Sequence, residues 1–228
     1  MSLIRERQSA EYRKIRDELM EAEAGLKNQR ETVAELRRSL PRGTKIETDY
    51  VFQEGPADLT KTSEPDFFET RLSQLFENGK DELIVDHMMF PPEWENGCPM
   101  CSMWADGFEA IAPHVTDKIN FVLVARAQLN KLREWGHKRG WQRLRLLSST
   151  NNTFNQDFGV ELARERQLPA MSVITRDEKG DIYHFYTTEG SLVESHHRAM
   201  DLFTPVWNLF DLLPSGRGDW LPKHFYTE

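Results

Sequence analysis

Two cysteines, Cys98 and Cys101, are the residues of this sequence whose type and spacing best support chemistry. They lie in Gly97-Cys98-Pro99-Met100-Cys101, and they are the only cysteines among the 228 residues. Two thiols separated by two residues can form and break a disulfide reversibly, and the thiolate of one can attack a disulfide on another molecule. The pair therefore predicts thiol–disulfide exchange.

The stretch from Pro99 to about His114 predicts a helix that begins at this motif, because proline suits the first helical turn. Apolar residues follow at helical spacing: Met100, Met103, Trp104, Phe108 and Ile111. A cysteine at a helix N-terminus faces unpaired N–H groups and the positive end of the dipole, which favour a thiolate. We therefore expect Cys98 to be the nucleophile and Cys101 to attack the mixed disulfide formed on Cys98.

Acidic residues near the motif oppose this effect in the sequence: Glu93, Glu95, Asp106 and Glu109. One carboxylate about 7 Å from a thiol, at an effective dielectric near 40, raises its pKa by roughly one unit. The helix dipole contributes about 0.3–1 kcal/mol in the other direction. We expect the two effects to offset largely, leaving the pKa of Cys98 moderately below the free value of about 8.5.

Two other interpretations of the cysteine pair stay open. The pair could supply half of a zinc site, which needs two more ligands. Only histidines could supply them, and none has a finger-like spacing: His87, His114, His137, His184, His196, His197 and His224. The pair could also be inert, since buried cysteine often acts as a small hydrophobe. We favour the redox interpretation, and we expect no metal and no cofactor.

Composition narrows the class of protein and its partners. The net charge of −8 and the pI near 5.5 argue against nucleic-acid binding, which needs clustered Lys and Arg. The N-terminus lacks the apolar run of a secretory signal, and no stretch is long and apolar enough to predict a membrane span. We expect a cytoplasmic protein, and in that compartment a lone C-x-x-C pair is more typical of redox function than of structure.

A regular apolar seam predicts a long helix near the N-terminus. Its positions alternate three and four apart: Tyr12, Ile15, Leu19, Ala22, Leu26, Gln29, Val33, Leu36 and Leu40. Pro41 and Gly43 should end it. Such a seam suits packing on the chain's own domain or pairing with a second copy in a coiled coil, and we expect a homodimer as one outcome. The predicted domains are a charged helical extension over 1–43 and a folded domain over 44–228.

Strands and helices alternate along the rest of the chain. We expect a strand near 50–52, a helix over 66–77, a strand over 82–90, the cysteine helix, a strand over 119–125, a helix over 127–138 and a strand over 144–148. A hairpin should follow over 171–175 and 182–186, and a last helix, kinked at Pro205, should run over 192–212. This order predicts an α/β fold: a three-layer sandwich on the thioredoxin plan, with a peroxiredoxin-like insertion and a long N-terminal helix.

These residues together resemble the thioredoxin-like family of predicted dithiol-disulfide oxidoreductases, a bacterial family of otherwise unknown function. The resemblance covers most of the chain. Its markers are the charged N-terminal helix, Asp49-Tyr50-Val51-Phe52, the block from Trp94 to Asp106, Asp157-Phe158-Gly159-Val160, and Asp211-Leu212-Leu213-Pro214-Ser215-Gly216-Arg217. It implies a thioredoxin-like fold with a thiol redox site and does not imply a substrate.

The resemblance also implies roles for single residues. A buried acid on the strand before the motif assists proton transfer in the wider superfamily, and Asp86 is the candidate here. It lies farther from Cys98 than the corresponding acid does in thioredoxin, so a solvated strand end is the interpretation we favour slightly. Pro169 is the candidate for the cis-proline opposite the cysteines. Peroxiredoxins carry Thr three residues before the attacking cysteine, whereas this chain has Glu95.

The sequence therefore predicts an enzyme that exchanges a Cys98–Cys101 disulfide with a thiol or disulfide of a protein or small molecule. Trp94, Pro99, Met100 and Pro169 are the expected substrate-binding residues. One alternative is a peroxiredoxin-like thiol peroxidase. The other is a non-catalytic redox-sensing protein that assembles through its N-terminal helix.

Overall fold

The computed structural model describes residues 8–62, 66–163, 166–189 and 203–226. Contacts divide the chain into two units, residues 1–41 and 42–228, and each is described by itself below. The elements in chain order are α2 (Ala10–Arg38), β1 (Thr44–Lys45), β2 (Val51–Glu54), β3 (Phe68–Arg71), the 3₁₀ helix η2 (Leu72–Leu75), β4 (Glu82–Met88), α3 (Pro99–Lys118), β5 (Asn120–Ala125), α4 (Leu129–Arg139), β6 (Leu146–Ser148), α5 (Phe154–Asp157), β7 (Glu161–Ala163), β8 (Arg166–Gln167), β9 (Ala170–Arg176), β10 (Ile182–Glu189) and α6 (Val206–Phe210).

The first unit is the helix α2, which confirms the predicted long N-terminal helix. Ser9 caps it by accepting a hydrogen bond from the Tyr12 N–H at 3.1 Å, and basic residues occupy its last turn, where they favour the helix dipole. No residue of α2 is buried, and large seam side chains such as Leu19 and Leu26 are about half exposed. The larger apolar side chains of the seam are therefore exposed within this unit.

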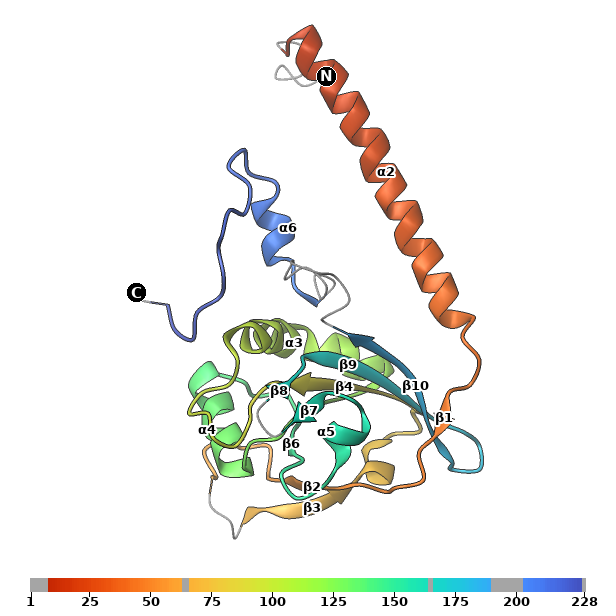
Figure 1. Ribbon diagram of the computed structural model, residues 1–228, viewed down its shortest axis with the longest axis vertical. Helices are drawn as coiled ribbons and strands as arrows, with labels where there is room; N and C mark the ends of the chain where they lie inside the picture. The colour runs from red at the N-terminus through yellow and green to blue at the C-terminus, as the bar shows by residue number, and fades with distance from the viewer. Residues whose placement is uncertain (1–7, 63–65, 164–165, 190–202, 227–228) are drawn as a thin grey trace. The chain divides into compact units, whose positions relative to one another are not determined.

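The second unit is built on a mixed eight-stranded sheet, with strand order β1-β10-β9-β4-β5-β6-β2-β3 among the described residues (Figure 1). In its centre β4 pairs in parallel with β5 and antiparallel with β9, and β9 and β10 form a hairpin. The helix α3 connects β4 to β5. This order, with a helix crossing over between the parallel strands, confirms the predicted thioredoxin-like α/β fold. Between the sheet strand β6 and β9, the chain forms α5 and the separate two-stranded sheet of β7 and β8.

Successive residues of β4 point to opposite faces of the sheet. Met88 joins a core cluster that contains both cysteines, Trp104 of α3 and Trp135 of α4. The odd-numbered Leu83 and Val85 instead join a second cluster with residues of η2 and α5. The sheet is therefore covered on both faces as a three-layer sandwich, and the thiols belong to the α3 face.

Two predicted helices differ from the structure. Residues 66–77 form β3 and η2 instead of a helix, because β3 pairs with β2 and buries Thr70, whose hydroxyl donates to Glu54 Oε2 at 2.6 Å. Of the helix predicted over 192–212, residues 192–202 lie outside the described residues. The described part contains the short α6, and Pro205 caps its start instead of kinking it. None of the helices in the described ranges is long and apolar enough to cross a membrane.

Candidate functional site

The first turn of α3 presents the two thiols. Cys98 is the N-cap of the helix, and Pro99 occupies the first helical turn, as the sequence predicts. The Cys98 N–H donates to the carbonyl of Met89 at 3.0 Å, which ties the motif to the end of β4. Both cysteines are free thiols, and only 8% of Cys98 and 1% of Cys101 are exposed. The structure therefore holds a reduced, buried dithiol.

The pKa values of the two thiols shift in opposite directions. A hydrogen bond from Cys101 lowers the pKa of Cys98 to about 7, and the N–H groups of Cys101 and Met100 add to this against the cost of burial. The hydrogen bond to Cys98 and its own burial raise the pKa of Cys101 well above the usual range of a thiol. At neutral pH Cys98 is therefore the thiol that carries negative charge. Its moderately lowered pKa agrees with the value expected from the sequence.

The acidic residues expected to offset the helix dipole do not act on Cys98 in this way. Glu93 and Glu95 are exposed in the loop before the motif. Asp106 forms an ion pair with Arg139 and accepts a hydrogen bond from the Trp141 indole. Glu109 accepts from the backbone N–H groups of residues 143 and 144. Burial of the sulfur, and not nearby negative charge, is what opposes the helix N–H groups.

Asp86 lies on the same side of β4 as the thiols and is 2% exposed, so the solvated strand end favoured from the sequence is wrong. It pairs in the sheet with Leu123 of β5 and Met171 of β9, which enclose it. Its Oδ2 has no hydrogen-bond partner among the described residues. Burial raises its pKa to about 7, and its charge contributes to the raised pKa of Cys101. Asp86 is therefore an unpaired buried acid beside the second thiol.

The predicted substrate-binding residues do not all gather at the thiols. Trp94 is 40% exposed in the preceding loop, where its carbonyl accepts from Lys131 Nζ at 3.0 Å. Met100 packs against the cysteine cluster. Pro169 directly precedes β9, but the described residues contain no cis peptide bond, so Pro169 is trans. Its side chain lines a separate cavity.

Three residues that the sequence did not indicate support the motif. Ser102 donates to the carbonyl of Cys98 at 2.9 Å and accepts from the Trp135 indole at 3.0 Å, which fixes the first turn of α3. From the C-terminal segment, His224 Nε2 donates to the carbonyl of Gly97 at 3.1 Å. A side chain at position 97 would clash with Met88 and Trp135, which explains the glycine.

The C-terminal segment therefore contacts the residue that precedes Cys98. The indole of Trp135 packs edge-on against both His224 and Phe225, with ring centres 5.8 and 5.7 Å apart. The Arg139 guanidinium donates to the carbonyl of His224 at 2.6 Å. We call residues 222–226 the C-terminal strap. In the sequence, the one signal for the contact between the strap and Gly97 is the polar and aromatic composition of the strap.

Within the described ranges, no group of three or more His, Cys, Asp or Glu residues could hold a metal ion. His196 and His197, which the zinc interpretation included, lie outside the described residues. The chemistry that the site can perform with its own groups is that of a thiolate, a second thiol and a buried carboxyl. These features define a dithiol protein of thioredoxin-like fold.

The chain belongs to the family described as "Bacterial protein of unknown function (DUF899)", which matches residues 1–226. None of the curated proteins matches it in sequence. The solved structures that it resembles include a PrxQ mutant from Xylella fastidiosa, with 11% identity over 73% of this chain and 95% of that one and a TM-score of 0.49. A 1-Cys peroxiredoxin described as an antioxidant protein of Plasmodium falciparum has 12% identity over 66% and 84%, with a TM-score of 0.48. Similarity at these values carries no argument about activity.

Proposed function

We propose that this protein is a thiol–disulfide oxidoreductase in which Cys98 attacks and Cys101 resolves. The observation that carries the proposal is that, at one helix N-terminus, the pKa of Cys98 is lowered and the pKa of Cys101 is raised. A thiolate is the nucleophile of disulfide exchange, and an attacking thiol with a pKa near the ambient pH reacts best. Cys98 meets that condition, and the raised pKa of Cys101 keeps Cys101 protonated until it attacks the mixed disulfide.

The proposed exchange proceeds in two steps. The Cys98 thiolate attacks one sulfur of a partner disulfide, so that a Cys98–partner disulfide forms and the other partner sulfur leaves as a thiolate. Cys101 then loses its proton and attacks Cys98, which releases the second partner sulfur as a thiolate. The partner disulfide has gained two electrons, and the protein holds a Cys98–Cys101 disulfide. A partner dithiol reverses both steps.

Asp86 is the proposed acceptor of the Cys101 proton. The second step requires Cys101 to ionise although burial and the neighbouring sulfur raise its pKa. A carboxyl whose pKa is about 7 is partly ionised at neutral pH and can accept that proton. Its burial on the thiol face supports this role.

Reduction of insulin disulfides by the reduced protein tests the proposal. Wild type should reduce insulin, and Cys98→Ser should abolish the activity. Cys101→Ser should instead accumulate a mixed disulfide through Cys98, visible by mass spectrometry, because the attacking thiol remains and the resolving thiol is gone. Failure of wild type to react, or trapping by Cys98→Ser in place of Cys101→Ser, would overturn the assignment.

The small exposed fraction of Cys98 favours a second candidate, reduction of a peroxide. A hydroperoxide reaches a covered sulfur more easily than a protein disulfide does. Cys98 would attack the terminal peroxide oxygen and become a sulfenic acid as the alcohol or water leaves, and Cys101 would then form the disulfide and release water. The absence of Thr at position 95 counts against this candidate. Peroxide consumption by wild type without insulin reduction would favour it.

We also propose that two copies of the chain pair through α2. The apolar seam repeats every seven residues on average, as a two-stranded coiled coil requires, and most of its side chains are exposed. An isolated charged helix gains little stability in water without such packing. The same pairing would serve the alternative in which the protein is a non-catalytic redox sensor.

A further inference from the structure

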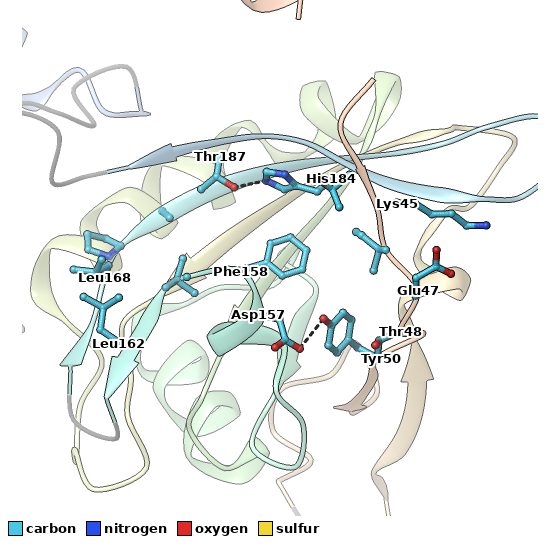
Figure 2. A pocket seen from close by; sticks show the side chains of 16 residues that line it. Lys45, Glu47, Thr48, Tyr50, Asp157, Phe158, Leu162, Leu168, His184 and Thr187 are labelled. Carbon is cyan, nitrogen blue, oxygen red and sulfur yellow. Dashed lines mark hydrogen bonds between the residues drawn. The ribbon is translucent and has the colours of Figure 1, made fainter. Parts of the chain in front are cut away.

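A cavity of about 710 Å³ opens on the sheet face opposite the thiols (Figure 2). Among its lining residues, Tyr50 belongs to the second core cluster and Phe158 packs against it, whereas the cysteines belong to the first. The volume is in the range of sites that bind small organic molecules, roughly 300–1,000 Å³. The dithiol chemistry proposed above makes no use of this space.

The cavity has an apolar end and a polar end. Val160, Leu162, Leu168 and Pro169 line one end, and Figure 2 shows Leu162 and Leu168 on the opposite side of Phe158 from Glu47. On the other side, Glu47, Thr48 and Tyr50 follow β1, and Asp157 lies beside Tyr50. A ligand that matches both ends has an apolar body and a polar head.

Three aromatic rings form the middle of the cavity. The Phe158 ring lies edge-on to His184, with centres 5.6 Å apart, and edge-on to Tyr50, with centres 6.3 Å apart. Burial lowers the pKa of His184, so this imidazole is neutral at physiological pH and brings no positive charge. Aromatic faces of this kind attract organic cations.

The wall that carries His184 is held from behind by a chain of hydrogen bonds. His184 Nε2 and Thr187 Oγ1 are 2.7 Å apart, Thr187 and Ser172 hydroxyls are 2.8 Å apart, and Ser172 Oγ lies 2.8 Å from His87 Nε2. Ser172 and His87 are almost fully buried. Because Ser172 and His87 are buried, this series of hydrogen bonds fixes the cavity wall before any ligand binds.

Asp157 offers a free acceptor at the polar end. The Tyr50 hydroxyl and the Thr153 hydroxyl both donate to its Oδ2, at 2.8 and 2.6 Å. No described residue donates to its Oδ1. Burial and then the bond to Asp157 raise the pKa of Tyr50 well above its usual range, so the phenol stays a neutral donor. The two hydrogen bonds to Oδ2 therefore orient the carboxylate, and Oδ1 can accept a hydrogen bond from a ligand.

The charges of the lining residues leave the polar end negative. Of the acidic lining residues, Asp157 lies beside Tyr50, whereas Glu47 lies close enough to the one cationic lining residue, Lys45, to raise its pKa. Lys45 Nζ pairs with Asp181 Oδ1 at 3.0 Å, and Figure 2 shows its nitrogen pointing away from the rings. This balance favours a positively charged head group.

We propose that the cavity binds a small organic amine. Its ammonium group donates to Asp157 Oδ1 and lies against the Tyr50 and Phe158 rings, and its apolar body extends along Val160 and Leu168. A charge-assisted hydrogen bond beside aromatic faces is a strong way to hold an ammonium. The site is independent of the thiols, so it stands whether or not the exchange activity is found.

Three probes with one skeleton test this proposal: 4-phenylbutylamine, 4-phenylbutanol and 4-phenylbutyrate, titrated by calorimetry into the full chain. The amine should bind best and the acid worst. Asp157→Asn should weaken amine binding by roughly three- to tenfold and leave the alcohol unchanged, because it removes charge and keeps an acceptor for Tyr50. Asp117→Asn, the same change at the exposed end of α3, should alter neither.

Amide chemical-shift mapping locates the bound amine independently of affinity. The largest shifts should fall on residues 157–160 and 184–187. Equal binding of amine and acid, an Asp157→Asn protein that keeps the full preference for the amine, or shifts confined to the α3 face would each overturn the proposal. Thermal melting of each variant verifies that a lost affinity does not come from unfolding.

Discussion

Replacing Asp86 by Asn should change how the stability of the reduced protein depends on pH. The pKa of Asp86 rises on folding from its ordinary 3.8 to about 7. Between these values the folded protein holds a proton that the unfolded chain has released, so the free energy of unfolding falls as the pH rises. At 1.36 kcal/mol per pKa unit, the loss across this window is roughly 4 kcal/mol.

His87, the next residue of β4, has the opposite effect. Burial lowers its pKa from the ordinary 6.5 to about 3. Between these values the unfolded chain holds the proton and the folded protein does not, so the free energy of unfolding rises with pH, by roughly 5 kcal/mol. The contributions of the two neighbours therefore nearly cancel in the wild type.

Urea unfolding with the thiols kept reduced, at several values from about pH 4 to pH 7, measures both contributions. As the pH rises from about 4 to 7, the unfolding free energy of Asp86→Asn should increase by roughly 4 kcal/mol relative to that of wild type, because of the two neighbours only His87 still titrates. His87→Gln should show the reverse, and the double variant should follow wild type. The other titrating groups are common to all four proteins and cancel in the comparison.

An Asp86→Asn unfolding free energy that runs parallel to that of wild type across the whole window would refute the raised pKa of Asp86. That result would mean that Asp86 keeps an ordinary pKa and is reached by solvent. A constant offset between the two curves of unfolding free energy against pH would not change that conclusion. A buried Asn amide without a partner shifts stability by about 1–3 kcal/mol, but it does so at every pH.

Three further outcomes are expected. Thiolate absorbance at 240 nm should titrate with a midpoint of about 7 in the reduced protein and lose that step in Cys98→Ser; a midpoint below about 5 would show that burial does not oppose the helix N–H groups. His224→Ala should raise the rate at which a bulky maleimide alkylates Cys98 several-fold, with a smaller effect on iodoacetamide, because the strap contact at Gly97 is lost; equal effects on both reagents would exclude a covering role. Changing Leu19 and Leu26 together to Asp should convert a dimer to a monomer in sedimentation, and unaltered sedimentation and melting would exclude the seam as an interface.

The elements around the thiols were predictable because their signals are local. Val85 and its neighbours form an apolar run that stops at Pro91, and Pro99 opens a helix with apolar residues at helical spacing. The hairpin β9–β10 has two stretches rich in β-branched and aromatic residues, with Gly180 at its turn, where φ is +86°. Local patterns of this kind suffice to assign a strand, a helix and the cysteine at their junction.

The partners of polar side chains were not predictable, because they come from distant parts of the chain. Asp106 and Glu109 lie near the cysteines in the sequence, yet Arg139 and the backbone near residue 143 engage them. Asp86 is buried because β5 and β9 flank it, and sequence distance from Cys98 contains no information about either strand. Residues 66–77 lack a strong strand pattern, and pairing with β2 decides their conformation.

The free energy attached to Asp86 is itself an argument for its proposed role. An unpaired carboxyl on the thiol face lowers stability at neutral pH by an amount comparable to a large fraction of the 5–15 kcal/mol that holds a typical domain folded. An apolar residue of similar size at this position would avoid that cost and leave the sheet pairing of β4 intact. Buried groups with strongly raised pKa values concentrate where proton transfer is required. Among the described residues, the neighbouring group that must lose a proton is Cys101, whose pKa the charge of Asp86 helps to raise.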